Sequence, residues 1–288
     1  AAVSAPGSVP GGLVDRDAVA DPQAAPTPAP ATTATNATEL CRPDRECLTI
    51  IRALMTHSTP VVKVRVPATC RSSGNVRCVT LTRLPQAVVA ELPPGHDEAG
   101  TRERILLASM AMFAEHGYHG ASLRDIGQAS GIRAASIYEH FGSKEDILAR
   151  LAAIGHELLL DRLRHALLDA GNDPRQQVHA LVAADVMAHG EYPVLAVVIE
   201  TELHALSPER AAPVLALRQQ LQLLALDVIN RGIDQDLLHP HNVVATLAAI
   251  GGMALRVPYW FTPSPDYPLE QLATDYADLA LVMLHAQP

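Results

Sequence analysis

Residues 101–151 read TRERILLASMAMFAEHGYHGASLRDIGQASGIRAASIYEHFGSKEDILARL, and this stretch decides the fold. Apolar residues recur in it every three or four positions, which is the spacing that places them on one face of a helix. Glycines separate the apolar runs, and glycine favours helix ends and tight turns. The stretch therefore predicts three short helices and a longer fourth one, at about 101–116, 122–129, 133–140 and 144–168.

Serine and aspartate mark where the second and fourth of these helices begin. Ser122 is followed three positions later by Asp125, and Ser143 is followed by Asp146. This is the spacing of a capping box, in which the hydroxyl and the carboxylate satisfy free backbone amides. Gly131 supplies the tight turn between the second and third helices. Three short helices with such a turn predict a helix-turn-helix.

This head, residues 98–151, has a small apolar centre. Each large apolar side chain contributes ~1.5–3 kcal/mol when buried, so the set barely offsets the entropy of ordering the head. We therefore expect the head to lean on the fourth helix and on the C-terminal half, so that a shift of that helix could re-aim it. The inward positions are Ile105, Ala108, Met112, Phe113, Leu123, Ile126, Ala129, Ile137 and Phe141.

Three strings in the head resemble the TetR family of bacterial regulators. They are F-A-E-x-G-Y at 113–118, S-L-R-D-I at 122–126 and G-I-R-A-A-S-I-Y-E-H-F-G-S-K-E-D-I-L at 131–148. The match is specific, because a generic helix-turn-helix would not also reproduce Y-x-H-F-x-S-K. One departure is Gly127, where the family more often has alanine, at a cost of ~1 kcal/mol to the helix.

The resemblance implies that the third helix enters the major groove of double-stranded DNA with its leading residues at base edges. Arg133 is the one side chain there that can fork onto guanine, and the two following alanines allow close approach. Tyr138 could instead pack in the head core, Lys144 could be a solvated charge, and Arg124 is expected to pair with local acids. The implied DNA-contacting residues are Ser122, Arg133, Ala134, Ala135, Ser136, Tyr138, His140 and Lys144.

Charge is unevenly distributed along the chain. Residues 152–288 hold 7 Lys/Arg and 16 Asp/Glu, which accounts for the whole net charge of −9. An acidic half is expected to stay off nucleic acid and anionic membranes. Residues 101–151 are neutral, with 6 basic and 6 acidic residues, which counts mildly against DNA binding. Helix dipoles and a few well-placed cations could still bind phosphates if Glu103, Glu115 and Glu145 face away.

Helical spacing continues to the end of the chain and predicts an all-α fold. Aromatic residues make up only 3%, which also disfavours a strand-rich fold. We expect a largely disordered or weakly structured Ala- and Pro-rich extension at 1–97, the helix-turn-helix head, and a helical ligand-binding and dimerisation domain at 152–288. The later helices are expected at 174–189, 191–205, 208–231, 241–256 and 268–285, with Pro213 kinking or delaying the third of these.

The resemblance also implies a homodimer that binds a small molecule. The last two helices have long apolar faces, and Gly251 and Gly252 permit close helix approach, although these faces could equally pack within one subunit. The string ELHALSPERAAPVLALRQQ at 202–220 and the terminal P-L-E-Q-L-A are similar to the branch that senses acyl-CoA thioesters. Residues implied to contact a small hydrophobic or acyl-CoA effector, or else plain core, are Met187, His189, Tyr192, Val197, Glu200, His204 and Trp260.

Other classes of site are not indicated. The spacing of the four cysteines, Cys41, Cys47, Cys70 and Cys78, matches no common zinc pattern, and the histidine pairs lack further ligands. We therefore expect no metal, no cofactor and no enzyme. The apolar run Val243–Leu255 is shorter than the ~20 residues of a membrane span, and no secretory n-region precedes an apolar stretch. We expect a cytoplasmic protein without membrane contact.

The function that these features predict is a dimeric transcriptional repressor, released from a palindromic DNA site by its ligand. Two alternatives remain open at this stage. One is a helical ligand-binding or scaffolding protein without DNA function, which the neutral head allows. The other is an all-helical enzyme acting on an acyl thioester.

Overall fold

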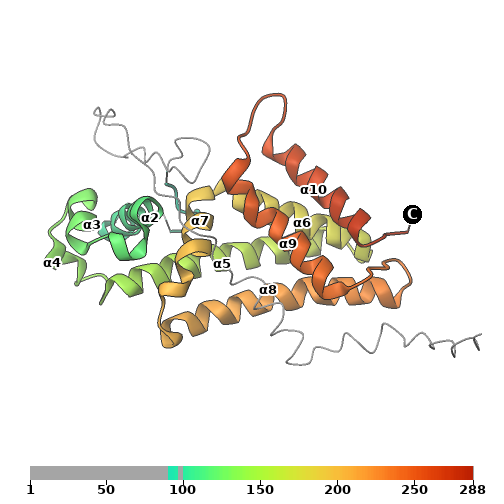
Figure 1. Ribbon diagram of the computed structural model, residues 1–288, viewed down its shortest axis with the longest axis horizontal. Coiled ribbons are helices and arrows are strands. Elements are labelled where there is room, and N and C mark those ends of the chain that lie inside the picture. Colours follow the sequence, from blue (N-terminus) through green and yellow to red (C-terminus); the bar gives the residue numbers. More distant parts are fainter. Residues whose placement is uncertain (1–89, 97–99, 288) are drawn as a thin grey trace, which may run out of the picture. The chain divides into compact units, whose positions relative to one another are not determined.

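The computed structural model describes residues 90–96 and 100–287. Every named element of this part is helical, as the sequence predicts, while the expected extension up to residue 89 and the four cysteines lie outside it. Figure 1 labels the α-helices. They are α2 (Thr101–Gly120), α3 (Leu123–Ser130), α4 (Ala134–Ile137), α5 (Lys144–Asp169), α6 (Pro174–Glu191), α7 (Pro193–Glu202), η2 (Leu203–Ala205), α8 (Pro208–Asp234), α9 (Val243–Trp260) and α10 (Leu269–Met283).

The predicted and observed helix ends agree closely, with three informative differences. Helix α4 has a single turn, and hydrogen-bonded turns rather than helix continue through His140. Gly117 breaks α2 with a positive φ of 74°, and one more turn follows it. Helix α8 runs from Pro208 through Pro213 to Asp234, so this proline neither delays the start of the helix nor ends it.

The head shares one apolar cluster with the C-terminal helices α5 to α10, which the sequence predicts to bind a ligand and which are here named the ligand domain. Phe113, Ile126 and Ile137 of the head are fully buried and pack in the same cluster as Leu151 of α5 and Val198 of α7. The small head therefore leans on α5 and α7, as the energetics of its size suggest.

Residues 90–96 pack against this cluster and differ from the expectation of a disordered or weakly structured segment. Ala90 and Leu92 are buried within it, and the carbonyl of Pro93 accepts a hydrogen bond from the N–H of His96 at 3.2 Å. The guanidinium of Arg150 on α5 lies 3.4 Å from the His96 ring. The prediction fails here because Leu92 adds apolar area that the head itself lacks.

Helices α5 to α10 form the ligand domain, in which α10 packs mainly on α6, and α5 packs on both α6 and α8 (Figure 1). Helix α9 contacts α6, α7 and α8. It extends beyond the predicted apolar run to Trp260, and its length and composition would allow it to cross a membrane. Of the segment Val243–Trp260, 28% is buried. The apolar run alone is too short for a membrane span, but the helix that contains it is not. The core helices of soluble proteins meet the same criterion.

Candidate nucleic-acid interface and ligand cavity

The turn before α4 is built around close backbone contacts. The Ser122 hydroxyl accepts a hydrogen bond from the N–H of Asp125 at 3.1 Å and so caps α3. Gly131 ends α3 with a left-handed φ of 74°. A Cβ at Gly127 would lie 3.0 Å from the carbonyl oxygen of Ile132 and 3.1 Å from the N of Ala134. Glycine at position 127 therefore lets the turn pack directly on α3, which explains the departure from alanine.

The leading end of α4 is open to solvent. Ile137 is the one fully buried residue of this helix, and Tyr138 is 60% exposed, which excludes the alternative that Tyr138 packs in the head core. Among the described residues, none bonds the Arg133 guanidinium. The predicted contact residues around α4 that are exposed are Arg133, Ala135 and Tyr138, and those that are half-buried are Ala134, Ser136 and His140.

Lys144 is not a freely solvated charge, and only part of its ammonium group is free to contact DNA. Its Nζ donates hydrogen bonds to the carbonyls of Tyr118 at 2.7 Å and Ala121 at 2.8 Å, and lies 4.4 Å from the centroid of the Tyr118 ring. Burial lowers the pKa of Lys144. The ammonium thus ties the start of α5 to the α2–α3 connection and keeps one N–H for another acceptor. Its contact with a phosphate stays a prediction.

Two arginines contribute to the same surface in ways that the sequence did not indicate. Arg102 donates to the carbonyl of His140 at 3.4 Å and stacks 4.5 Å over the Phe141 ring, so it supports the end of the α4 turn. Arg124 is exposed, and the expected ion pair with a local acid is not formed within the described part of the chain. Arg124 is therefore a further cation on the face of α3.

Buried polar contacts join the head to the end of α7. Glu202 is only 6% exposed, and its carboxylate accepts hydrogen bonds from the N–H of Tyr118 at 3.0 Å and the hydroxyl of Thr201 at 3.1 Å. Glu145 accepts from the N–H of Ser207 at 2.6 Å, and hydrogen bonding with the Ser207 side chain and then its backbone holds the pKa of Glu145 below the usual range. Glu145 therefore faces the ligand domain and not the surface of α4.

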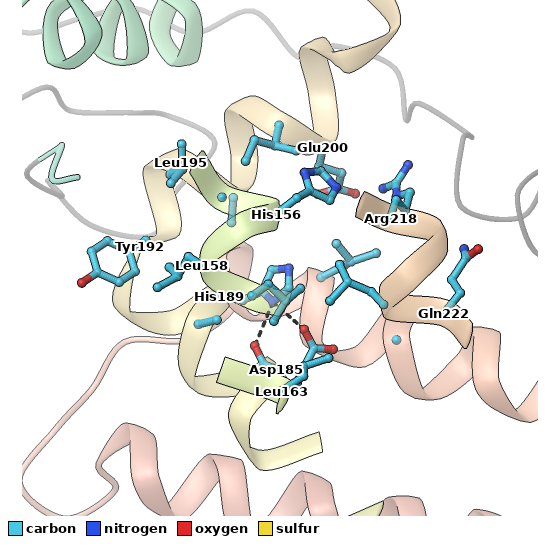
Figure 2. Close-up of a pocket in the computed structure, with 18 of the residues that line it drawn as sticks. His156, Leu158, Leu163, Asp185, His189, Tyr192, Leu195, Glu200, Arg218 and Gln222 are labelled. Atoms are coloured by element: carbon cyan, nitrogen blue, oxygen red, sulfur yellow. Dashed lines mark hydrogen bonds and ion pairs between the residues drawn. The ribbon is translucent and has the colours of Figure 1, made fainter. Parts of the chain in front are cut away.

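A cavity of about 170 Å³ lies between α5, α6, α7, α8 and α9 (Figure 2). Its wall is mainly apolar, and its polar residues come from four different helices. Such an apolar space with a few convergent polar groups is the usual form of a small-molecule site. Apolar wall residues include Leu159, Leu195, Ile199, Leu221 and Leu247.

Two histidines of the cavity have opposite electrostatic surroundings. Burial lowers the pKa of His156 to about 4, because little solvent reaches the ring to stabilise a charge. Burial also opposes charging of His189, but the Asp185 carboxylate, with help from Glu200, raises its pKa above the usual value. The Asp185 Oδ1 lies 3.1 Å from Nδ1 of His189 (Figure 2). His156 is therefore neutral at pH 7, while the pKa of His189 is shifted in the opposite direction.

Glu200 and Arg218 complete the polar part of the wall. The Tyr259 hydroxyl donates to Glu200 at 2.7 Å, and Arg256 lies 3.9 Å from the other oxygen of the same carboxylate. Burial lowers the pKa of Arg218, and the negative charge of Glu200 partly opposes this. In Figure 2 the Tyr192 hydroxyl points away from these groups.

The structure brings only part of the predicted ligand set together. His189, Tyr192 and Glu200 line the cavity. The other four lie outside it: Val197 packs in the head cluster, His204 is exposed on η2, Trp260 is half exposed beside Phe261, and Met187 packs against the α9–α10 cluster. These residues come from four different elements, and the spacing of apolar residues does not determine how each element is rotated toward the cavity.

Sequence reasoning overlooked His156 and Arg218, although a signal was present. His156 lies at helical spacing with Ala152, Leu159 and Leu163, and Arg218 takes a similar place on α8. A polar residue within an apolar stripe must either find a buried partner or face a cavity. Such interruptions of the stripe could have identified both.

Comparison with known proteins agrees with this architecture. The family model for "Bacterial regulatory proteins, tetR family" matches residues 105–151, and that for "Tetracyclin repressor-like, C-terminal domain" matches residues 171–284. The chain belongs to the TetR family. As a member it is a DNA-binding transcriptional regulator, and the sequence-based recognition of the family is confirmed.

Relatives match both the whole regulator and the head alone. The chain is 27% identical over 184 residues to the transcriptional repressor KstR2 of Mycobacterium tuberculosis, covering 63% of this chain and 90% of that protein. It is 40% identical over 58 residues to the repressor AcnR of Corynebacterium glutamicum, covering 20% of this chain and 31% of AcnR.

Solved structures share the fold across most of the described residues. A TetR-family protein from Rhodococcus RHA1 has a TM-score of 0.61 at 27% identity and covers 65% of this chain and 98% of its own. The structure of KstR2 from Mycobacterium tuberculosis, described as a ketosteroid transcriptional regulator, has a TM-score of 0.59 at 25% identity and covers 66% of this chain and 96% of its own.

Proposed function

We propose that this TetR-family regulator is a homodimeric repressor, released from a palindromic operator when a small, largely apolar effector fills the cavity. The observation that carries the proposal is the position of α7. Ile199 and Glu200 of this helix line the cavity, and Glu202, two residues later, holds the α2 turn of the head. A molecule in the cavity thus presses on the helix that positions the DNA-binding surface.

DNA binding is assigned to the exposed leading end of α4. Arg133 can form two hydrogen bonds with a guanine edge, while Ala134 and Ala135 allow close approach and can contact thymine methyl groups. Ser122, Tyr138, His140 and the remaining N–H of Lys144 are then placed to contact the backbone, together with the amides at the start of α3. Ser136 completes the base-facing end of the helix.

A homodimer is supported by apolar surface that one subunit leaves uncovered. Val282 of α10 is 70% exposed, and Leu279, one turn before it, is exposed as well. A Cβ at Gly252 on α9 would meet no atom within 4 Å, so that face of α9 is open. Two copies joined symmetrically would present two α4 helices to half-sites ~34–36 Å apart, hence a palindromic operator.

The effector is proposed from the cavity and from the KstR2 relative. The apolar wall suits a hydrophobic molecule, and KstR2 is described as a ketosteroid regulator. An acyl-CoA thioester, whose acyl chain would enter the cavity, is the alternative effector. Release would need a coupling of ~1–3 kcal/mol, which changes DNA affinity ~5–150-fold. We further propose that the protein acts in the cytoplasm and does not transform its effector.

The proposal is tested by selecting binding sites from random duplexes and measuring affinity by fluorescence anisotropy. We expect an enriched palindrome, and a loss of at least tenfold in affinity for Arg133→Ala with Tyr138→Ala. Native mass spectrometry should find two protein copies for each duplex. Absence of any enriched palindrome would favour a ligand-binding or scaffolding protein, and turnover of bound thioester would favour an enzyme.

A further inference from the structure

His156 brings an unusual polar atom to the cavity. The residue is only 7% exposed, lies on the cavity wall, and comes from the middle of α5 between apolar neighbours. Its Nδ1 lies 2.8 Å from the carbonyl oxygen of Ala152, one helical turn earlier. Within the described chain, no donor or acceptor lies within hydrogen-bonding distance of its other nitrogen, Nε2.

The contact with Ala152 fixes which nitrogen carries the proton. A carbonyl oxygen can only accept, so Nδ1 must be the donor of this hydrogen bond. Burial keeps the ring neutral near pH 7. A neutral imidazole with its proton on Nδ1 has a lone pair on Nε2. His156 therefore offers the cavity a hydrogen-bond acceptor.

The groups around His156 supply the opposite function. Arg218 of α8 and His189 of α6 are close enough to disfavour a charge on His156, and both are donors when charged. Nδ1 of His189 is directed at Asp185, so its Nε2 is the nitrogen left for a cavity ligand. Glu200 is engaged by Tyr259 and lies near Arg256. The polar end of the cavity thus places the acceptor nitrogen of His156 near the guanidinium donors of Arg218.

We infer that the effector carries a hydroxyl group at this end, which donates to Nε2 of His156 and accepts from Arg218. A hydroxyl can donate and accept at the same time, whereas a ketone or ester oxygen would leave Nε2 without a donor. This inference rests on the proposed role of the cavity as the effector site. It narrows the effector class to apolar alcohols, or to larger molecules whose inner end is an alcohol.

The cavity size sets the probes for a test. A cavity of about 170 Å³ is similar to the ~150 Å³ apolar cavity that holds benzene in an engineered protein. A six-membered ring with one oxygen substituent is therefore a suitable probe. Cyclohexanol and cyclohexanone share their carbon skeleton and differ in whether the oxygen can donate.

The experiment compares the dissociation constants of the two probes, measured by NMR titration of the full chain without DNA. We expect the wild type to bind cyclohexanol more tightly, and His156→Phe to reduce the ketone-to-alcohol ratio of dissociation constants about five- to tenfold. His165→Phe is the matched control. His165 lies on the same helix with the same Nδ1 bond to the carbonyl four residues earlier, but is exposed outside the cavity.

A spectroscopic measurement on the wild type does not depend on the variant folding. In ¹⁵N-labelled protein the imidazole resonances distinguish a bare Nε2 from one that accepts a hydrogen bond. Cyclohexanol should shift the Nε2 resonance of His156 and cyclohexanone should leave it nearly unchanged.

Three results would each overturn the inference. The first is equal binding of both probes by wild type and by His156→Phe. The others are a proton on Nε2 of His156, or no binding of either probe in the cavity. A separate readout concerns the proposed function. One outcome is that cyclohexanol is preferred while neither probe lowers the affinity for the selected duplex. In that case the hydroxyl site at His156 is supported, and release from DNA by these two probes is contradicted. If no duplex is selected at all, the DNA proposal fails independently.

Discussion

Removing the Glu202 carboxylate should loosen the head while leaving the cavity intact. Glu202 lies outside the cavity wall, and its buried carboxylate accepts the N–H of Tyr118 at 3.0 Å. Glu202→Ala leaves this amide without its acceptor, which costs ~1–3 kcal/mol for a buried donor. Glu202→Gln keeps an acceptor oxygen but loses the charge, so we expect about half of that cost.

Urea unfolding and fluorescence anisotropy measure the two consequences. The free energy of unfolding should fall by ~1–3 kcal/mol for Glu202→Ala and by less for Glu202→Gln. Affinity for the selected duplex should fall as well, because a loosened head must be ordered on binding. Binding of cyclohexanol should change by less than about twofold, since no cavity residue is altered.

Glu209→Ala is the control for this change. It removes the same charge from an exposed side chain in the first turn of α8, so only a few tenths of a kcal/mol should be lost. If Glu202→Ala retains wild-type stability and DNA affinity, the polar link between α7 and the head has no energetic role. If Glu202→Ala weakens the binding of cyclohexanol and leaves DNA binding unchanged, the assignment of Glu202 to the head contact is wrong.

Gly127→Ala should lower the melting temperature and the DNA affinity, although alanine favours helix by ~1 kcal/mol, because its Cβ would press on backbone at 3.0 Å; a higher melting temperature would contradict this. Val282→Arg should shift the protein to monomer in analytical ultracentrifugation, while Leu168→Arg, at an 80% exposed position of α5, should not. His156 has a folded pKa of about 4, below its value when unfolded, so the unfolded chain takes up more protons between pH 6.5 and pH 4. The free energy of unfolding should therefore decrease by up to ~3 kcal/mol as the pH is lowered from 6.5 to 4. Urea unfolding of His156→Phe should lack this pH-dependent contribution.

The features predicted correctly from sequence are those that local chemistry determines. The cap at Ser122, the turn at Gly131 and the helix ends depend on residues within about four positions of one another. The recognised strings also lie in one short segment. The exposure of the α4 leading end follows from the same local pattern, because Ile137 takes the inward position and its neighbours face out.

The features missed depend on residues that are distant in sequence. Glu202 and Tyr118 are 84 positions apart, so no periodicity connects them. Lys144 has the spacing of an exposed cation, yet the carbonyls it binds belong to the end of another helix. The cavity combines faces of five helices, and the rotation of each helix decides whether Trp260 or Arg218 faces inward.

Helix α7 lines the cavity with one face and contacts the head with another, so a substitution in it affects both ligand binding and the position of the head. A substitution at Ile199 that widens the cavity would also alter the helix that ends at Glu202. The wall residues Leu221 of α8 and Leu247 of α9 belong to a different apolar cluster from the one that packs the head. Anyone redesigning this regulator as a biosensor for a new compound should therefore vary α8 and α9 first, and related natural sensors should diversify their ligands along the same two helices.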